Sequence, residues 1–138
     1  MKIYLSYSHK DSELAKQISD ELLKSGLDVW DAETEIFPGD NWAEKVSNAL
    51  EDSDAMVVLV SPDSLGSRTV QREIEYALGN KAYRNRLITV LIDSEKGLAD
   101  ESIFWILKKL KTIRLPRSEQ TVEGINQVAE AVKTALGS

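Results

Sequence analysis

One carboxylate in the sequence, Glu73, stands where it could do chemistry. It lies three residues after Val70 and four before Ala77, so on a helix it sits at the edge of the apolar stripe. A partly buried carboxylate beside a cleft is a candidate for catalysis, because its pKa is shifted. The alternative is a structural role, in which Glu73 pairs with Arg72 or Lys81 at the boundary of the core. Position alone favours the structural role.

Other polar side chains follow the segments that we predict as strands. The run Ser6–Asp11 follows the first strand, and Ser61–Asp63 follows the third. In open α/β sheets, ligands bind beyond the carboxyl ends of the strands, where the strand order reverses. We therefore expect a crevice beside these two segments, with the loop Asp31–Asp40 and the helix start Thr69–Glu73 as its walls. The free N–H groups that begin the first helix could hold a phosphate there.

The elements that must position these residues alternate between strand and helix. Five strands are predicted, at Lys2–Tyr7, Leu27–Trp30, Ala55–Ser61, Leu87–Ile92 and Thr112–Leu115. The continuously apolar run Ala55–Val60 suits a central parallel strand that is covered on both faces. The order of the elements predicts an α/β fold of the flavodoxin-like type. Its three layers are a five-stranded parallel sheet, in the order 2-1-3-4-5, with helices on both faces.

Five helices are predicted between and after these strands. The first carries the apolar stripe Leu14, Ile18 and Leu22 and ends near Gly26, and the others cover about 41–52, 69–83, 102–110 and 122–136. Asp11 or Ser12 would cap the first helix, and Asn41 would cap the second. The side chains expected to face inward are Trp42, Val46, Ala49 and Leu50, then Val70, Ile74, Ala77 and Leu78, then Val122, Ile125, Val128, Ala129, Val132 and Leu136.

The composition narrows the possible functions. A length of 138 residues predicts a single domain over 1–138. The absence of Cys and a single His, His9, argue against a metal site. The net charge of −6 argues against nucleic-acid binding. The apolar runs are too short to span a bilayer and the N-terminus shows no signal pattern, so we expect a cytoplasmic protein without membrane attachment.

Several common catalytic motifs are absent from the sequence. There is no P-loop, no GxGxxG after the first strand and no GxSxG elbow. Each of three residues has two possible roles. Trp42 would either anchor its loop in the core, which position favours, or stack on an aromatic base. Asp31 would either start a turn or accept a hydrogen bond from a ribose hydroxyl. His9 lies in a polar loop, and we interpret it as a solvated residue rather than a catalytic base.

Five segments together resemble the Toll/interleukin-1 receptor (TIR) domain family, with the bacterial or archaeal members as the nearest type. The first is an apolar strand that ends in Ser-Tyr, and the third resembles the BB loop of the family. The segments are Ile3–Ser8, Gly26–Asp31, Ile36–Trp42, Ala49–Pro62 and Arg72–Leu78. The resemblance runs from about Ile3 to Leu115. Five motifs in the right order make it specific, although no single motif is decisive.

The resemblance implies an enzyme that cleaves NAD⁺. Glu73 matches the catalytic Glu of the NAD⁺-cleaving members. Tyr7, Ser8 and His9 would touch the ribose and phosphates, and the residues implied on the nucleotide side are Asp31, Phe37 and Trp42. NAD⁺ would be the substrate, with no separate cofactor. The products would be nicotinamide with ADP-ribose or a cyclic isomer of it, in immune-type signalling or anti-phage defence.

The resemblance also implies an alternative and a set of partners. The alternative is a non-catalytic module for TIR–TIR interaction, as in a scaffold or adaptor. In either case we expect self-association through the segment Glu33–Trp42, and a downstream effector protein is a further partner. One departure favours the alternative. Many catalytic members carry a Trp four residues before the Glu, and Thr69 occupies that place here.

Overall fold

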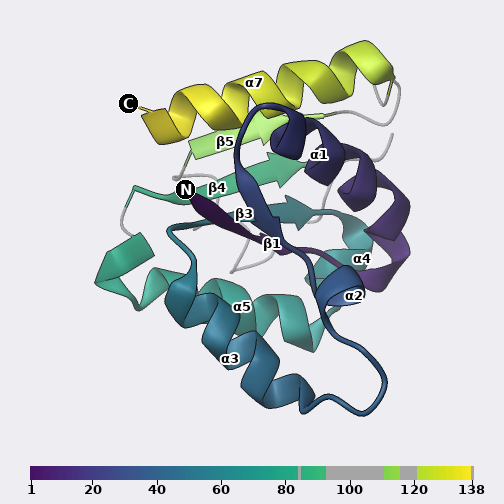
Figure 1. Cartoon of the computed structure of the whole chain (residues 1–138). Coiled ribbons are helices and arrows are strands. Elements are labelled where there is room, and N and C mark those ends of the chain that lie inside the picture. Colours follow the sequence, from purple (N-terminus) through teal and green to yellow (C-terminus); the bar gives the residue numbers. More distant parts are fainter. Residues whose placement is uncertain (84, 93–110, 116–120, 138) are drawn as a thin grey trace.

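A five-stranded parallel sheet forms the centre of the molecule in a computed structural model, which describes residues 1–83, 85–92, 111–115 and 121–137 (Figure 1). The strand order is β2-β1-β3-β4-β5. The strands are β1 (Lys2–Ser6), β2 (Asp28–Trp30), β3 (Ala55–Val60), β4 (Leu87–Leu91) and β5 (Lys111–Arg114). The predicted order and the parallel pairing of all neighbours are therefore confirmed.

The central strand β3 is buried along its whole length. It pairs with β1 in the register Ile3↔Ala55 and with β4 in the register Met56↔Leu87. A strand with hydrogen-bonded neighbours on both sides and helices on both faces leaves no position for a polar side chain. This explains why its sequence is continuously apolar.

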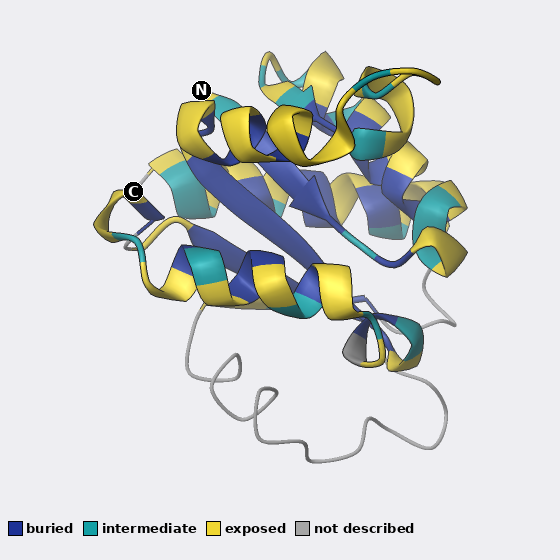
Figure 2. Ribbon diagram, turned by 90° about the horizontal axis from the view of Figure 1, so that it is seen from below, coloured by how far each residue is buried: buried dark blue, intermediate teal, exposed yellow. Residues whose placement is uncertain are grey.

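Within the described part of the chain, helices pack on both faces of the sheet (Figure 1). The helices α1 (Ser12–Lys24) and α7 (Val122–Gly137) pack on one face, and α3 (Trp42–Asp52) and α5 (Arg68–Leu78) pack on the other. Figure 2 shows the buried strands between helices whose outer sides are exposed. Side chains alternate along β1, so Ile3 and Leu5 face α1 and α7 while Tyr4 faces α3 and α5.

Among the described residues, three short helical elements were not predicted: η1 (His9–Asp11), α2 (Ala32–Glu35) and α4 (Pro62–Leu65). A fourth, η2 (Lys81–Tyr83), falls within the helix predicted over 69–83. Asp31 caps α2, and Ser61, which was predicted to end the third strand, caps α4; both accept through their side-chain oxygens. Asn41 caps α3 as predicted, with its Oδ1 accepting from Glu44 N at 3.1 Å. Asp11 precedes α1, but its carboxylate does not cap the helix and accepts a hydrogen bond from the Ser61 hydroxyl instead.

Three predictions about the helices were wrong. The helix predicted over 69–83 ends at Leu78, because Gly79 and Asn80 terminate it before η2. Leu78 and Val122 are exposed rather than inward, since each lies at the end of its helix. Trp42 is also half exposed and does not anchor its loop in the core. The helix predicted over 102–110 lies outside the described residues. No helix within the described ranges is long and apolar enough to cross a bilayer.

The turn that joins α1 to β2 depends on Gly26, whose φ is +89°. Replacing Gly26 with Ala is expected to reduce the free energy of unfolding by about 1–2 kcal/mol, because a Cβ strains this left-handed conformation. Urea unfolding measures the change. Gly66→Ala is the control, since Gly66 has a negative φ and its new Cβ would meet only Asp63 O, at 3.7 Å. Equal losses in the two variants would contradict this account.

Candidate functional site

A pocket of about 230 Å³ opens where β1 ends and α5 begins. Side chains from five parts of the chain line it. They include Tyr4 of β1, Tyr7 and His9 of the segment that follows β1, Glu33 of α2, Trp42 of α3, Ser67 and Thr69 at the start of α5, and Glu73 one turn further along α5. The pocket lies at the predicted carboxyl-end position of β1. The segment Ser61–Asp63, predicted beside the crevice, does not line it and instead begins α4.

Glu73 is the most unusual side chain of this pocket. It is only 7% exposed, so it is buried rather than partly buried as predicted. The Tyr4 hydroxyl donates a hydrogen bond to its Oε2, and the Ser6 hydroxyl donates one to its Oε1 at 2.9 Å. Glu73 forms no ion pair with Arg72 or Lys81, all three of which the structure describes. The predicted ion pair of Glu73 with a neighbouring cation is therefore not formed.

The burial of Glu73 changes its acidity. Loss of solvent raises the pKa of Glu73 from 4.5 to about 8, because burial disfavours the charged form. The two donated hydrogen bonds act in the opposite direction, since they stabilise the carboxylate. With its pKa raised to about 8, Glu73 is mostly protonated at pH 7. The group can therefore exchange a proton with a substrate or respond to a positive charge near neutral pH.

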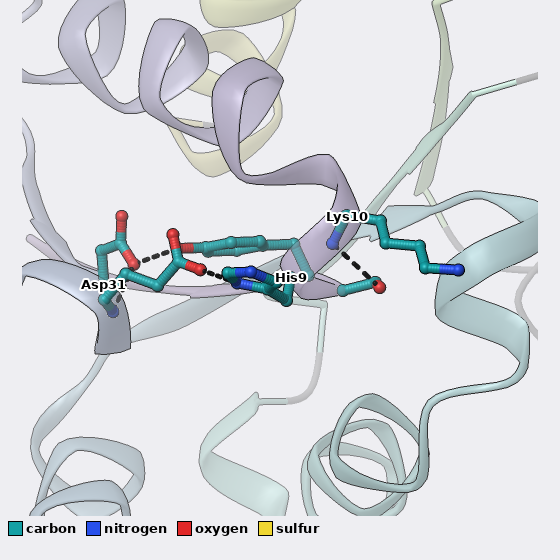
Figure 3. Close-up of polar contacts among 6 residues, drawn as sticks. His9, Lys10 and Asp31 are labelled. Carbon is teal, nitrogen blue, oxygen red and sulfur yellow. Dashed lines mark hydrogen bonds and ion pairs between the residues drawn. The ribbon is translucent and has the colours of Figure 1, made fainter.

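A second polar chain joins the loop after β1 to the loop after β2. The Tyr7 hydroxyl donates to Asp31 Oδ1, which also accepts from Glu33 N at 3.0 Å. Burial raises the pKa of Tyr7 well above its ordinary value, and the hydrogen bond to Asp31 is the next largest cause of this increase. His9 Nδ1 lies 2.6 Å from Glu33 Oε1. Figure 3 shows Asp31 and His9 on one side of the loop, with Lys10 extending away from them.

The structure brings some of the predicted site residues together and leaves others apart. Tyr7, His9, Trp42 and Glu73 line the pocket. Asp31 is buried behind it and contacts Tyr7. Two further predicted residues also do not line it: Ser8, whose hydroxyl accepts weakly from Lys10 N at 3.4 Å, and Phe37, which is 63% exposed.

The sequence analysis missed Tyr4 as a buried neighbour of Glu73, and it placed Ser6 beside the crevice without pairing it with Glu73. The signal was present in the alternation of β1, because residues two apart on a strand face the same side. The face that carries Tyr4 and Ser6 is the face on which α5 packs. Glu33 was also missed as a pocket residue, since nothing in the sequence indicated that a short helix follows Asp31.

Two aromatic rings face solvent, one in the loop between α2 and α3 and one on the first residue of α3. Phe37 is 63% exposed and Trp42 is 50% exposed. Phe37 N donates to Asp40 Oδ2 at 2.9 Å, and Gly39 adopts a φ of +93°. The turn is therefore held by the Asp40 carboxylate and by the backbone bond from Asp40 N to Phe37 O at 3.0 Å, while the rings stay uncovered. No group of three or more acidic or His side chains that could hold a metal ion occurs among the described residues.

Comparisons with known proteins agree with this architecture. A family model described as "TIR domain" matches residues 3–129. The TIR domain of the Toll-related receptor TRR-2 from Hydra magnipapillata aligns with a TM-score of 0.68 and 15% identity, over 95% of this chain and 97% of that one. A metazoan TIR-STING receptor from C. gigas aligns with a TM-score of 0.68 and 23% identity, over 92% of this chain and 38% of the receptor.

A prokaryotic SEFIR domain is similar as well, with a TM-score of 0.62 and 17% identity, over 95% of this chain and 91% of that one. No curated protein sequence matches the chain. At these identities the structural alignments show a shared fold, while the family model spans most of the sequence. Motifs, sheet order and family model agree, and the chain belongs to the TIR domain family.

Proposed function

We propose that the protein cleaves NAD⁺ between nicotinamide and ribose, with Glu73 as the catalytic residue. The observation that carries the proposal is a buried carboxyl group, free of any ion pair with its neighbours Arg72 and Lys81, in a pocket at the carboxyl end of β1. Such a group is costly to bury in its charged form, and perturbed carboxyl groups in clefts mark functional sites.

The chemistry suits a single carboxylate. Nicotinamide leaves as a neutral molecule, so no general acid is needed, unlike ordinary glycoside hydrolysis with its two carboxyl groups. The ribose develops oxocarbenium-like positive charge, which a nearby carboxylate stabilises in a water-poor site. Because the nicotinamide ring of NAD⁺ is itself a cation, its arrival also favours the ionised form of Glu73. Hydrolysis then consumes water and yields nicotinamide, ADP-ribose and a proton, whereas internal attack yields a cyclic isomer.

The remaining pocket residues would bind the rest of the nucleotide. The exposed ring of Trp42 offers a face on which a base can stack, and Tyr7 and His9 offer polar groups beside it. The volume of about 230 Å³ is smaller than the roughly 300–1,000 Å³ typical of small-molecule sites. The pocket of one chain would therefore hold only part of a dinucleotide.

A second copy of the chain would complete the site. The uncovered Phe37 and Trp42 beside the pocket supply apolar area for self-association through Glu33–Trp42. We place this activity in immune-type signalling or anti-phage defence in the cytoplasm, with a downstream effector that responds to the product. The family assignment directly supports a role in signalling.

The test is release of nicotinamide by the purified protein at high concentration with a crowding agent. We expect release that increases more than linearly with protein concentration, because the assembled form is the active one. Separation of products by mass and retention then distinguishes a hydrolase from a cyclase. No release under assembling conditions would count against catalysis.

A non-catalytic TIR–TIR interaction module is the second candidate function. It is favoured by Thr69, which lines the pocket where many catalytic members carry a Trp, so one stacking surface is lost. It is also compatible with the exposed rings of Phe37 and Trp42. An interaction module would self-associate without consuming NAD⁺. Substitution of Glu73 would not change its assembly.

Gly39→Pro is expected to weaken self-association under either function. Proline fixes φ near −65°, whereas Gly39 requires +93°, so the loop that carries Phe37 must change shape. Sedimentation velocity under assembling conditions is expected to show a shift toward the monomer, together with lower NAD⁺ consumption. Gly26→Ala, which strains a remote left-handed turn, controls for destabilisation alone. Unchanged sedimentation and activity in Gly39→Pro would exclude this loop from the interface.

A further inference from the structure

Both oxygens of Glu73 are held by hydroxyl groups of one strand. Tyr4 and Ser6 lie two residues apart on β1, and both are about 1% exposed. Tyr4 donates to Oε2 and Ser6 donates to Oε1, so each carboxyl oxygen accepts a hydrogen bond from the sheet. The other end of Glu73 is fixed by α5, where Val70 and Ile74 pack in the core. The carboxyl group is therefore held between a helix and the sheet.

The two donors are themselves fixed by the core. The ring of Tyr4 stacks on Trp30, with a centroid distance of 5.0 Å and an interplanar angle of 17°. Ser6 is the last residue of β1 and pairs with Val58 of the fully buried strand β3. The positions of the two hydroxyls do not depend on the loops around the pocket. Their hydrogen bonds to Glu73 therefore persist whether or not those loops rearrange.

No cation compensates the charge of Glu73 in the part of the chain that the structure describes. The ionisable side chains that share its pocket come from β1 (Tyr4), the loop after it (Tyr7), η1 (His9) and α2 (Glu33). His9 is paired with Glu33. α3 contributes Trp42, which carries no charge. The ionised form of Glu73 therefore depends on neutral donors, and hydrogen bonds to a charged group are the stronger kind.

We propose that Tyr4 and Ser6 are positioning residues that orient the Glu73 carboxyl group and stabilise its ionised form. The kinetic part of this inference rests on the proposed NAD⁺ cleavage, but the part that concerns protonation does not. Loss of either donor raises the pKa of Glu73, because the carboxylate loses a bond that favours it more than it favours the neutral acid. The ionised fraction at neutral pH then falls.

The decisive measurement is an NMR titration of protein labelled with ¹³C at the Glu side-chain carboxyl, with the Glu73 signal assigned by its loss in Glu73→Gln. Tyr4→Phe and Ser6→Ala are each expected to raise the titration midpoint of Glu73 by about one pH unit. Tyr4→Phe keeps the ring that stacks on Trp30, so the fold is preserved. If one of the two variants fails to fold, the other still decides the question.

Two matched controls make the same chemical changes away from Glu73. Tyr83→Phe removes a buried hydroxyl that donates to Leu50 O at 2.6 Å, and Ser53→Ala removes one that donates to Ala49 O at 2.6 Å. Neither is expected to move the Glu73 titration. A midpoint that stays in place in both Tyr4→Phe and Ser6→Ala, or that moves equally in the controls, overturns the proposal.

The kinetic readout is the pH profile of nicotinamide release. Tyr4→Phe is expected to lower kcat at pH 7 about tenfold with little change in KM, and to restore it as the pH is raised, because the ionised fraction limits the rate. A loss of kcat that is the same at every pH overturns a role through protonation. Absence of release by the wild-type protein counts against the proposed function, and the NMR titration still tests the two donors in that case.

Discussion

Replacing Glu73 with Gln is expected to reduce nicotinamide release at least a hundredfold at saturating NAD⁺. The substitution keeps the shape of the side chain and lets it bond to the Tyr4 and Ser6 hydroxyls, while it removes the negative charge that stabilises the oxocarbenium-like ribose. Removal of one preorganised electrostatic group from an active site typically costs a factor of roughly 10²–10³ in kcat. Initial rates over a range of NAD⁺ concentrations measure the change, and the loss is expected in kcat rather than KM.

Glu75→Gln is the matched control for this prediction. Glu75 lies on the same helix, two residues later, and is exposed on its outer side. The same loss of one negative charge at that position is expected to leave kcat within about twofold, because exposed charges are screened by solvent. Equal activities of Glu73→Gln and the wild type would refute a catalytic role for Glu73. The interaction-module function would then be the better account.

Most of the fold could be predicted because its main signals are local. The apolar run of β3 has no polar alternate, and only a strand that is covered on both faces tolerates this. The spacing of Leu14, Ile18 and Leu22 likewise requires a helix with one buried stripe, and α1 buries all three. The strand order then follows from the alternation of strands and helices together with the handedness of their connections.

The depth at which Glu73 lies could not be predicted, because it depends on contacts across 67 and 69 residues of sequence to Ser6 and Tyr4. The helical pattern of α5 placed Glu73 at the edge of the core, and only the opposing strand shows that two hydroxyls receive it there. The prediction that Trp42 is buried was wrong for a related reason. A ring at the first residue of a helix is buried only if another part of the chain packs over it. Among the described residues, the loop before α3 leaves half of this ring uncovered.

Glu73 by itself is expected to lower the free energy of unfolding as the pH rises from about 5 to 8. In the unfolded chain this carboxyl group ionises near its ordinary pKa of 4.5, whereas burial raises the pKa of Glu73 to about 8 in the folded protein. In that window the folded state binds more protons than the unfolded state, so the free energy of unfolding decreases as the pH rises. Over the whole interval the contribution amounts to roughly 5 kcal/mol as an upper bound, at about 1.4 kcal/mol per pH unit.

Glu73→Gln should remove this pH dependence, since a neutral amide resembles the protonated acid. Urea unfolding at pH 5 is expected to give similar stabilities for the two proteins, whereas at pH 8.5 the variant should be more stable by several kcal/mol. The difference between the proteins isolates residue 73 from every other titrating group, and Glu75→Gln should retain the wild-type slope. A Gln variant that gains no stability at high pH would mean that the ionised carboxylate is already well compensated by Tyr4 and Ser6. The gain in stability and the loss of activity expected from one substitution have the same origin, because the charge that is costly to bury is the charge that the ribose cation would meet.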